Sequence, residues 1–372
     1  MLSELSIFFG LSISFTIAFL IIPKVVKVAR IKHLFDIPNH RSASKQVIPR
    51  LGGIAIFVGF ILGFIFSSGN LSVFSAKYML AGVFIMFLIG LKDDLIGLAA
   101  KKKLFFQILV AILLTTLGNL KITNLHGIFG LYEIDFISGT ILSIVIIVGL
   151  INAINLTDGI DGLAGGISLL ASIGYGYFFI QADDHSYTLI SLSLAGSLIA
   201  FLIYNIFGKS NKIFMGDSGS LVVGTILAIL TIHFNEFTAA NLSEECLPAI
   251  SLALIIYPVI DTLRVFAIRI LQKKSPFTPD MNHIHHNLLR LTKNHLSTTL
   301  IILGVNGLIV LFAFSFINII GNAWLFLILL ILGFTLAYVP VILNRIKEEY
   351  PEAMQDSKSV FTFFLFTKKL KD

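Results

Sequence analysis

Charged residues are scarce in this sequence, and cysteine is almost absent. Only 13% of the 372 residues are charged, whereas 56% are hydrophobic and 34 are Phe. A soluble protein of this length would lack the polar surface it needs to stay in solution, so the composition indicates a polytopic membrane protein. The single cysteine, Cys246, excludes a disulfide bond within the chain.

The first residues also lack the features of a removable secretory signal. No basic segment precedes the first apolar run, no small-residue cleavage site follows it, and the only early charge is Glu4. We therefore expect this run to be retained as a spanning helix.

Apolar runs of spanning length recur through the sequence. A spanning helix needs roughly 20 mostly apolar residues. On that criterion the sequence predicts an all-α membrane protein with about eleven transmembrane helices, at residues 4–29, 50–68, 77–97, 103–120, 138–156, 162–181, 187–207, 219–235, 246–271, 297–320 and 323–344. Residues 1–372 would form one transmembrane catalytic domain, with cytoplasmic segments at 30–50, 272–297 and 345–372.

The distribution of Lys and Arg predicts the orientation. Of the 27 such residues, all except Lys77 and Lys121 fall in the connections on one side. Short cytoplasmic loops are enriched in Lys and Arg, so this side is cytoplasmic, the N-terminus is outside and the C-terminus is inside. The basic groups are dispersed among short loops, which excludes a nucleic-acid surface; they favour attraction to anionic lipid.

A polar cluster, NAINLTDGIDGLAGG, follows an apolar run at residues 152–166. A carboxylate near a bilayer is costly without a partner, so ionisable groups there are usually functional. Asp158 and Asp161 are three residues apart, and we expect them to share one helix face with Asn155.

Two further acidic motifs end or begin predicted spans. Asp93 and Asp94 are adjacent before Lys101–Lys103, and we expect them to point about 100° apart on a helix. One could bind a metal while the other serves a different group; the alternative is a solvated loop pair. Asp217 lies among glycines at a helix entry, either as a metal ligand or as a simple N-cap. Its backbone N–H groups could meet anionic oxygens.

The longest internal loop carries a histidine cluster within SPFTPDMNHIHH. His283, His285 and His286 could bind a metal or donate hydrogen bonds to phosphate or sugar oxygens. Zinc is the weaker interpretation, because the chain has one cysteine and every Asp motif lies on the same side. Asp261 and Arg264, three residues apart, form either a structural ion pair or a catalytic one.

These clusters together predict a hard cation, Mg²⁺ or Mn²⁺. Mg²⁺ is usually held by one or two carboxylates together with substrate phosphates, which predicts a diphosphate substrate. All the clusters lie on the predicted cytoplasmic side. This arrangement favours an enzyme over the alternative of an ion-coupled transporter, whose polar groups would more often lie near the midplane.

Four motifs carry a resemblance to a known family. NAINLTDGIDGLAGG, KIFMGDSGS, the Asp93–Asp94 pair and SPFTPDMNHIHH occur in the order found in the polyprenyl-phosphate N-acetylhexosamine-1-phosphate transferases. The sequence resembles the WecA/TagO branch of the superfamily that also contains MraY, over roughly residues 30–345.

The resemblance implies a reaction in the bacterial cytoplasmic (inner) membrane. A polyprenyl phosphate such as undecaprenyl phosphate would attack the β-phosphorus of a UDP-N-acetylhexosamine, most simply UDP-GlcNAc, and release UMP. The product would start a lipid-linked cell-envelope glycan, with the active site facing the cytoplasm and Mg²⁺ as cofactor. The phospho-MurNAc-pentapeptide transferase of the same superfamily is the alternative, and a monomer and a homodimer both stay open.

The resemblance also implies residue roles. Four carboxylates would be catalytic: Asp93, Asp94, Asp158 and Asp161. Two would hold the metal: Asp217 and Asp158. Three residues would lie near the nucleotide: Asn155, Asn205 and Phe214. The ring of Phe214 would stack on uracil. Four would hold the sugar or its phosphate: His283, His285, His286 and Arg264.

The sequence departs from the family pattern at two positions. Gly97 stands where the family often has a third carboxylate, so only Asp93 and Asp94 are carried over. Ser44 stands where the first loop often has His, so that loop is given no catalytic role. We still expect Arg50 and the glycines after it to border the site.

Overall fold

A computed structural model describes residues 2–34, 48–68, 73–236, 247–275 and 281–349. Several features discussed from the sequence lie outside these ranges: Ser44 of the first loop, Cys246, and the tail beyond residue 349. The described part is all-α, as predicted. It contains an isolated β-bridge between Asn124 and Glu133.

The described part of the chain consists mainly of helices. In chain order they are α1 (Leu2–Ile31), α2 (Gly52–Ser67), α3 (Val73–Ile96), α4 (Ala100–Ile112) with the π-turn η1 (Leu113–Leu117), the 3-10 turn η2 (Ile128–Gly130), α5 (Phe136–Thr157), α6 (Leu163–Gln181), α7 (His185–Phe207), α8 (Gly216–Glu236), α9 (Leu247–Leu254), α10 (Ile256–Leu271), α11 (Ile284–Thr292), α12 (His295–Ile320) and α13 (Asn322–Glu349).

Each of the eleven predicted spans coincides with helical structure. Seven described helices are long and apolar enough to cross a membrane on their own, and α9 with α10 would make an eighth, bent by 78°. The chain is therefore a polytopic membrane protein. The number of spans that cross completely, and the side that each end faces, stay predictions.

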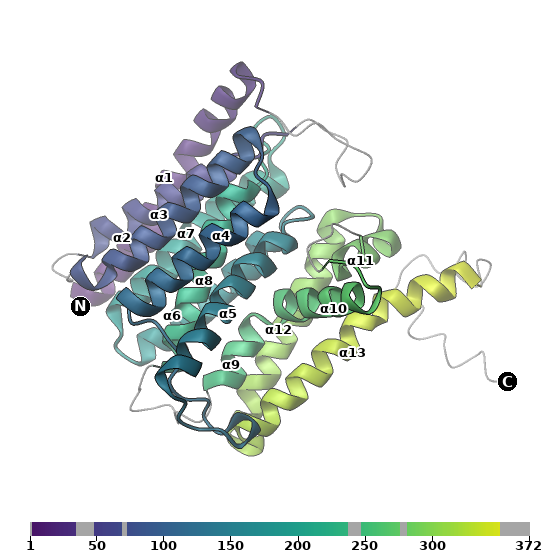
Figure 1. Ribbon diagram of the computed structural model, residues 1–372. Coiled ribbons are helices and arrows are strands. Elements are labelled where there is room, and N and C mark those ends of the chain that lie inside the picture. Colours follow the sequence, from purple (N-terminus) through teal and green to yellow (C-terminus); the bar gives the residue numbers. More distant parts are fainter. Residues whose placement is uncertain (1, 35–47, 69–72, 237–246, 276–280, 350–372) are drawn as a thin grey trace.

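Helix α8 lies at the centre of the bundle. In Figure 1, α1 and α13 lie at opposite edges and α8 lies between them. Within its most apolar stretch 89% of the residues are buried, against 22% in α1 and 28% in α13. Its sequence, GDSGSLVVGTILAILTIHFNE, presents small and apolar side chains on all faces, as expected for a helix enclosed by other helices. The first turn of α8 is thus surrounded by the ends of its neighbours.

The break between α9 and α10 has identifiable causes. Ile255 leaves helical geometry (φ −117°, ψ 17°), and a new helix begins at the next residue. A helix start exposes N–H groups, which are costly to leave unpaired in a membrane. Pro258 has no N–H, and the side-chain oxygen of Asn306 on α12 accepts from the Tyr257 N–H at 3.3 Å. The bend turns α10 across the bundle toward the histidine segment.

Candidate active site

The site is built around the first turn of α8. Gly216 adopts φ +71°, which brings the chain sharply into the helix. A Cβ at Gly216 would collide with the carbonyl oxygen of Arg50 and would lie 2.8 Å from the Asp94 carboxylate. Because only glycine fits here, Asp217 is presented beside the first loop and the end of α3.

The segment before α8 is hydrogen-bonded to the end of the first loop. The Phe214 N–H donates to the Pro49 carbonyl at 2.8 Å, and the Phe214 carbonyl accepts from the Gly52 N–H at 2.9 Å. Arg50 and the glycines after it therefore border the site, as expected. The Phe214 side chain is partly exposed.

Asp94 caps helix α8. Its two carboxylate oxygens accept from the Asp217 N–H at 2.8 Å and from the Ser218 N–H at 2.9 Å. A carboxylate at this position also complements the positive end of the helix dipole. Asp217 lies inside the first turn, so the alternative that it is a simple N-cap is wrong. The N–H groups at this helix start do meet anionic oxygens, and these oxygens belong to Asp94.

Asp93 points to a different partner, as the 100° separation predicts. The Lys103 ammonium lies 2.8 Å from Asp93 Oδ2 and 3.5 Å from Asp217 Oδ1, and so bridges the two carboxylates. The Leu98 N–H donates to the other Asp93 oxygen. Asn155 donates to Asp217 and, at 2.8 Å, to Ser220. Asn155 therefore orients Asp217 directly.

Asp158 and Asp161 do not share a helix face, so that expectation was wrong. Helix α5 ends at Thr157, and the residues that follow form a turn before α6. Asp158 faces the carboxylate cluster, whereas Asp161 pairs with Lys212 at 2.7 Å and with His295 at 3.3 Å. Burial would raise the pKa of Asp161, but hydrogen bonds from His295 and Lys212 outweigh burial and lower it.

The environment of Asp158 fits a bound cation. Burial, and then the charges of Asp217 and Asp94, raise the pKa of Asp158 to about 7. Such an excess of negative charge is relieved by a cation. Among the described residues no three His, Cys, Asp or Glu side chains converge enough to hold a metal by themselves. This donor set suits Mg²⁺, which is commonly held by one or two carboxylates together with substrate phosphates.

Asn205 is buried and paired with backbone at both ends of its amide. Its oxygen accepts from the Gly162 N–H at 2.6 Å, and its nitrogen donates to the Ile213 carbonyl at 2.9 Å. It ties the turn after α5 to the segment before α8. The structure thus brings Asn205 beside the site, where it positions these two backbone segments.

The histidine segment is organised by a buried carboxylate on α10. Asp261 accepts from His283 Nδ1 and from the Ile284 N–H, both at 2.8 Å. Arg264 lies 3.3 Å from the same carboxylate, and both side chains are buried, so they form a structural ion pair. Arg264 also donates to the Asn282 carbonyl, which fixes the start of α11.

The histidines meet the Asp158 turn. A Cβ at Gly159 would collide with Nε2 of His285, so the imidazole lies against the turn. Burial, and then the neighbouring His286, lower the pKa of His285 to about 3, which keeps this imidazole neutral. The His286 ring lies 4.3 Å from that of His285 and is partly exposed. Nδ1 of His285 lies 3.2 Å from the Tyr257 hydroxyl.

Comparison with known proteins identifies the family. A model of glycosyl transferase family 4 matches residues 76–235. A probable undecaprenyl-phosphate N-acetylglucosaminyl 1-phosphate transferase of Bacillus subtilis is 33% identical over 76% of this chain and 77% of its own length. This chain belongs to glycosyl transferase family 4.

Other family 4 relatives carry related names. An undecaprenyl-phosphate alpha-N-acetylglucosaminyl 1-phosphate transferase of Yersinia pestis is 30% identical over 74% of each chain. A decaprenyl-phosphate N-acetylglucosaminephosphotransferase of Mycobacterium leprae is 32% identical over 71% of this chain and 72% of its own length. The family 4 match runs from α3 to α8 and includes the whole carboxylate cluster, whereas the histidine segment lies beyond it.

Three site residues of this family 4 protein were not singled out from the sequence. Lys103 appears there only as a nearby cation, Lys212 only inside a quoted motif, and His295 was given no chemistry. Lys212 and His295 lie far from Asp161 in the chain and meet it only through folding, so no local pattern reveals them. Lys103 had a local signal, because it lies ten residues after Asp93 in a basic run.

Proposed function

We propose that this protein transfers N-acetylhexosamine 1-phosphate from a UDP-sugar to a polyprenyl phosphate and releases UMP. The observation that carries the proposal is the carboxylate cluster of Asp93, Asp158 and Asp217 at the start of α8, in which Lys103 bridges Asp93 and Asp217. The names of the relatives support undecaprenyl or decaprenyl phosphate as acceptor and N-acetylglucosamine as the sugar. We further propose that the site faces the cytoplasm across the bacterial inner membrane.

The reaction is a phosphoryl transfer, in which positioning and charge neutralisation supply most of the catalysis. An oxygen of the acceptor phosphate forms a bond to the β-phosphorus, and the bond from that phosphorus to UMP breaks. Mg²⁺, held by Asp217 and Asp158 with the diphosphate oxygens, would neutralise negative charge when bound. Lys103 would bind a phosphate oxygen in place of part of its contact with Asp93.

The two adjacent carboxylates take different roles. Both oxygens of Asp94 are occupied by α8 N–H groups, so Asp94 positions Asp217. Asp93 instead pairs with Lys103 and contacts the side chain of Asp217, so we assign it to orienting the acceptor phosphate. Phe214 would stack on the uracil, and Asn155 and Asn205 would act by holding the loops beside the nucleotide. His286 is the exposed member of the histidine segment and would contact the sugar phosphate.

The test is a UMP-release assay on the purified protein in detergent with undecaprenyl phosphate. The donor panel contains UDP-GlcNAc, UDP-GalNAc and UDP-MurNAc-pentapeptide, each with Mg²⁺ and with EDTA. We expect UMP from UDP-GlcNAc, dependence on Mg²⁺, and loss of activity in Asp217→Asn. Release of UMP only from UDP-MurNAc-pentapeptide would contradict UDP-GlcNAc as the donor. Near-normal turnover of Asp217→Asn would contradict the assignment of Asp217 as a metal ligand.

A further inference from the structure

Two amide side chains, Gln107 of α4 and Asn152 of α5, are hydrogen-bonded to each other in both directions. Asn152 Nδ2 donates to Gln107 Oε1 at 2.7 Å, and Gln107 Nε2 donates to Asn152 Oδ1 at 3.4 Å. Asn152 Nδ2 also donates to the Val148 carbonyl of its own helix at 2.8 Å. Gln107 is buried. Asn152 belongs to the polar cluster at residues 152–166, yet the proposed reaction gives it no role.

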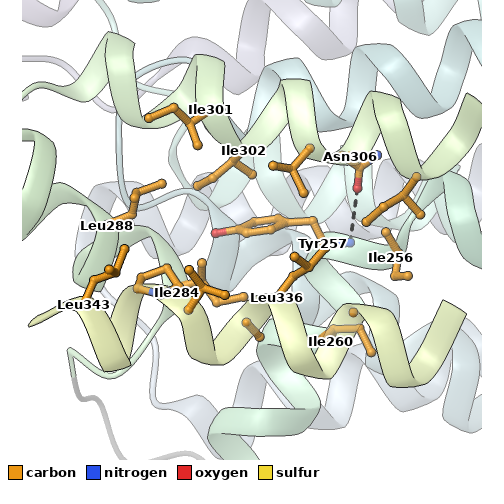
Figure 2. A pocket seen from close by; sticks show the side chains of 16 residues that line it. Ile256, Tyr257, Ile260, Ile284, Leu288, Ile301, Ile302, Asn306, Leu336 and Leu343 are labelled. Atoms are coloured by element: carbon orange, nitrogen blue, oxygen red, sulfur yellow. Dashed lines mark hydrogen bonds between the residues drawn. The ribbon is translucent and has the colours of Figure 1, made fainter. Parts of the chain in front are cut away.

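This pair differs from two other buried amides of the bundle. Figure 2 shows Asn306 of α12 in the wall of an apolar cavity, where its side-chain oxygen accepts from the Tyr257 N–H at 3.3 Å. Asn235, near the end of α8, donates to the Ser251 hydroxyl at 3.0 Å. Gln107 and Asn152 instead each supply a donor and an acceptor to the other. Both bonds form only when the two helices lie in one particular register.

Helix α4 has little apolar packing to fix its register. Three of its residues are buried: Gln107, Val110 and Ala111. Four of its large apolar side chains are exposed: Phe105, Ile108, Leu109 and Ile112. In packed helices a single buried polar contact can specify the register while adding little stability. The amide pair therefore specifies how α4 lies along α5.

About one helical turn from the pair, both helices present a group to the same oxygen of Asp217. Lys103 precedes Gln107 by four residues on α4, and Asn155 follows Asn152 by three on α5, so each lies on the same helix face as its neighbour in the pair. The Lys103 ammonium lies 3.5 Å from Asp217 Oδ1, and Asn155 donates to that oxygen. A shift or rotation of α4 against α5 would withdraw Lys103 from Asp217.

We propose that Gln107 and Asn152 are positioning residues, whose amide pair fixes α4 on α5 in the register that places Lys103 between Asp93 and Asp217. Both amides act through Lys103, the cation that would bind a phosphate oxygen. The effect on turnover rests on the proposed function, whereas the effect on the placement of Lys103 does not.

The placement of Lys103 is tested by acetylation of the purified protein with succinimidyl acetate, mapped by mass spectrometry. Lys103 is held between two carboxylates, whereas Lys102 on the same turn is exposed and serves as the internal reference. Gln107→Met keeps the length of the side chain and removes the amide. It should raise the ratio of Lys103 to Lys102 acetylation about fivefold, as expected when a partly exposed ion pair is lost.

The matched control is Asn235→Leu, which removes a buried amide at the opposite end of α8 and should leave this ratio unchanged. Asn152→Leu breaks the same pair from α5 and provides a second variant with the same expected rise. Thermal unfolding in detergent identifies the folded variants. An unchanged ratio in folded Gln107→Met or Asn152→Leu would overturn the proposal, as would an equal rise in Asn235→Leu.

The link to turnover is measured by UMP release. Gln107→Met should lower kcat about tenfold, because a small misplacement of a charged group is costly in catalysis. In a Lys103→Met background it should cause no further loss, since the group that it positions is already gone. Two independent losses would instead multiply to about a thousandfold, and that result would overturn action through Lys103.

Exchange of the two amides provides a rescue. Gln107→Asn shortens one side of the pair and should lower kcat, whereas Gln107→Asn with Asn152→Gln keeps the summed length and should restore most of it. Failure of the exchange to restore kcat would contradict the pairing. Absence of UMP release under every condition would instead contradict the proposed function and leave the acetylation result standing.

Discussion

At the scale of single residues, Lys103 is the cation that makes the carboxylate cluster tolerable. It bridges Asp93 and Asp217 across two helices, α3 and α8, and lies partly buried between them. A positive charge at this point would also stabilise the charge that develops in phosphoryl transfer.

Lys103→Met keeps the length of the side chain and removes its charge. We expect kcat for UMP release to fall about a hundredfold, as when one stabilising group is removed from a transition state. Lys102→Met is the matched control, because Lys102 is exposed on the same helix turn. Equal activity of the two variants would contradict the role of Lys103.

Asp93 and Asp94 should separate into a catalytic and a structural residue. Asp94→Asn replaces one acceptor of the α8 cap by a donor, and we expect it to cost about 2 kcal/mol of stability as well as activity. Asp93→Asn should lose activity with a change in stability of at most about 1 kcal/mol. Thermal unfolding in detergent, measured beside UMP release, distinguishes them. A larger loss of stability in Asp93→Asn would reverse the assignment.

Which site residues can be predicted from the sequence depends on where their partners lie. Asp158 and Asp217 belong to compact polar motifs at the ends of apolar runs, so their clustering was predictable. The cap formed by Asp94, and the contact of His295 with Asp161, join residues more than a hundred positions apart. No local spacing encodes such contacts; only the packing of α3 on α8 and of α12 on the Asp161 turn creates them.

At the scale of elements, the first turn of α8 depends on close backbone packing with α2. A Cβ at Gly53 would collide with the Gly219 nitrogen and the Ser218 carbonyl carbon, which are backbone atoms that cannot move aside. Gly53 is therefore required for α2 to pack against the first turn of α8.

Gly53→Ala should push α2 away from α8. We expect a loss of about 3 kcal/mol in stability, as for overpacking in a close-packed interior, together with loss of UMP release. Gly149→Ala on α5 is the control, because no atom lies within 4 Å of its added Cβ. It should retain activity and gain up to ~1 kcal/mol from helix propensity. Normal thermal stability of Gly53→Ala would contradict the packing argument.

The hydropathy of the sequence predicted where the helices lie more accurately than it predicted where they are interrupted. The predicted span at 246–271 covers α9 and α10 as one, because a running average of apolar residues does not register a single residue such as Ile255 leaving the helix. The predicted spans at 138–156 and 162–181 leave a break at the Asp158–Asp161 turn, and this break is present. The error was to apply helical spacing to two carboxylates that lie within the break, where Gly159 and Gly162 favour a turn.

At the scale of the whole molecule, the charge asymmetry predicts which end of the bundle faces the cytoplasm. The carboxylate cluster and the histidine segment lie at the same end, because His285 contacts the Asp158 turn. If the positive-inside rule holds here, that end faces inward.

Cysteine accessibility tests this orientation. In a Cys246→Ser background, Ser210→Cys lies near the carboxylate end and Gln181→Cys at the other end of α6, and both positions are exposed. A membrane-impermeant maleimide should label Gln181→Cys in intact cells and Ser210→Cys only after permeabilisation. The opposite pattern would place the site outside and contradict a cytosolic nucleotide donor.

The most direct test of the central claim follows the phosphorus atom. The protein is incubated with undecaprenyl phosphate and UDP-GlcNAc labelled with ³²P at the β-phosphorus, the one attached to the sugar. Transfer of the sugar 1-phosphate predicts that the label moves into the lipid fraction in a one-to-one ratio with unlabelled UMP. Label that stays in released UDP, with an unlabelled lipid-linked sugar, would show transfer of the sugar alone and contradict the account.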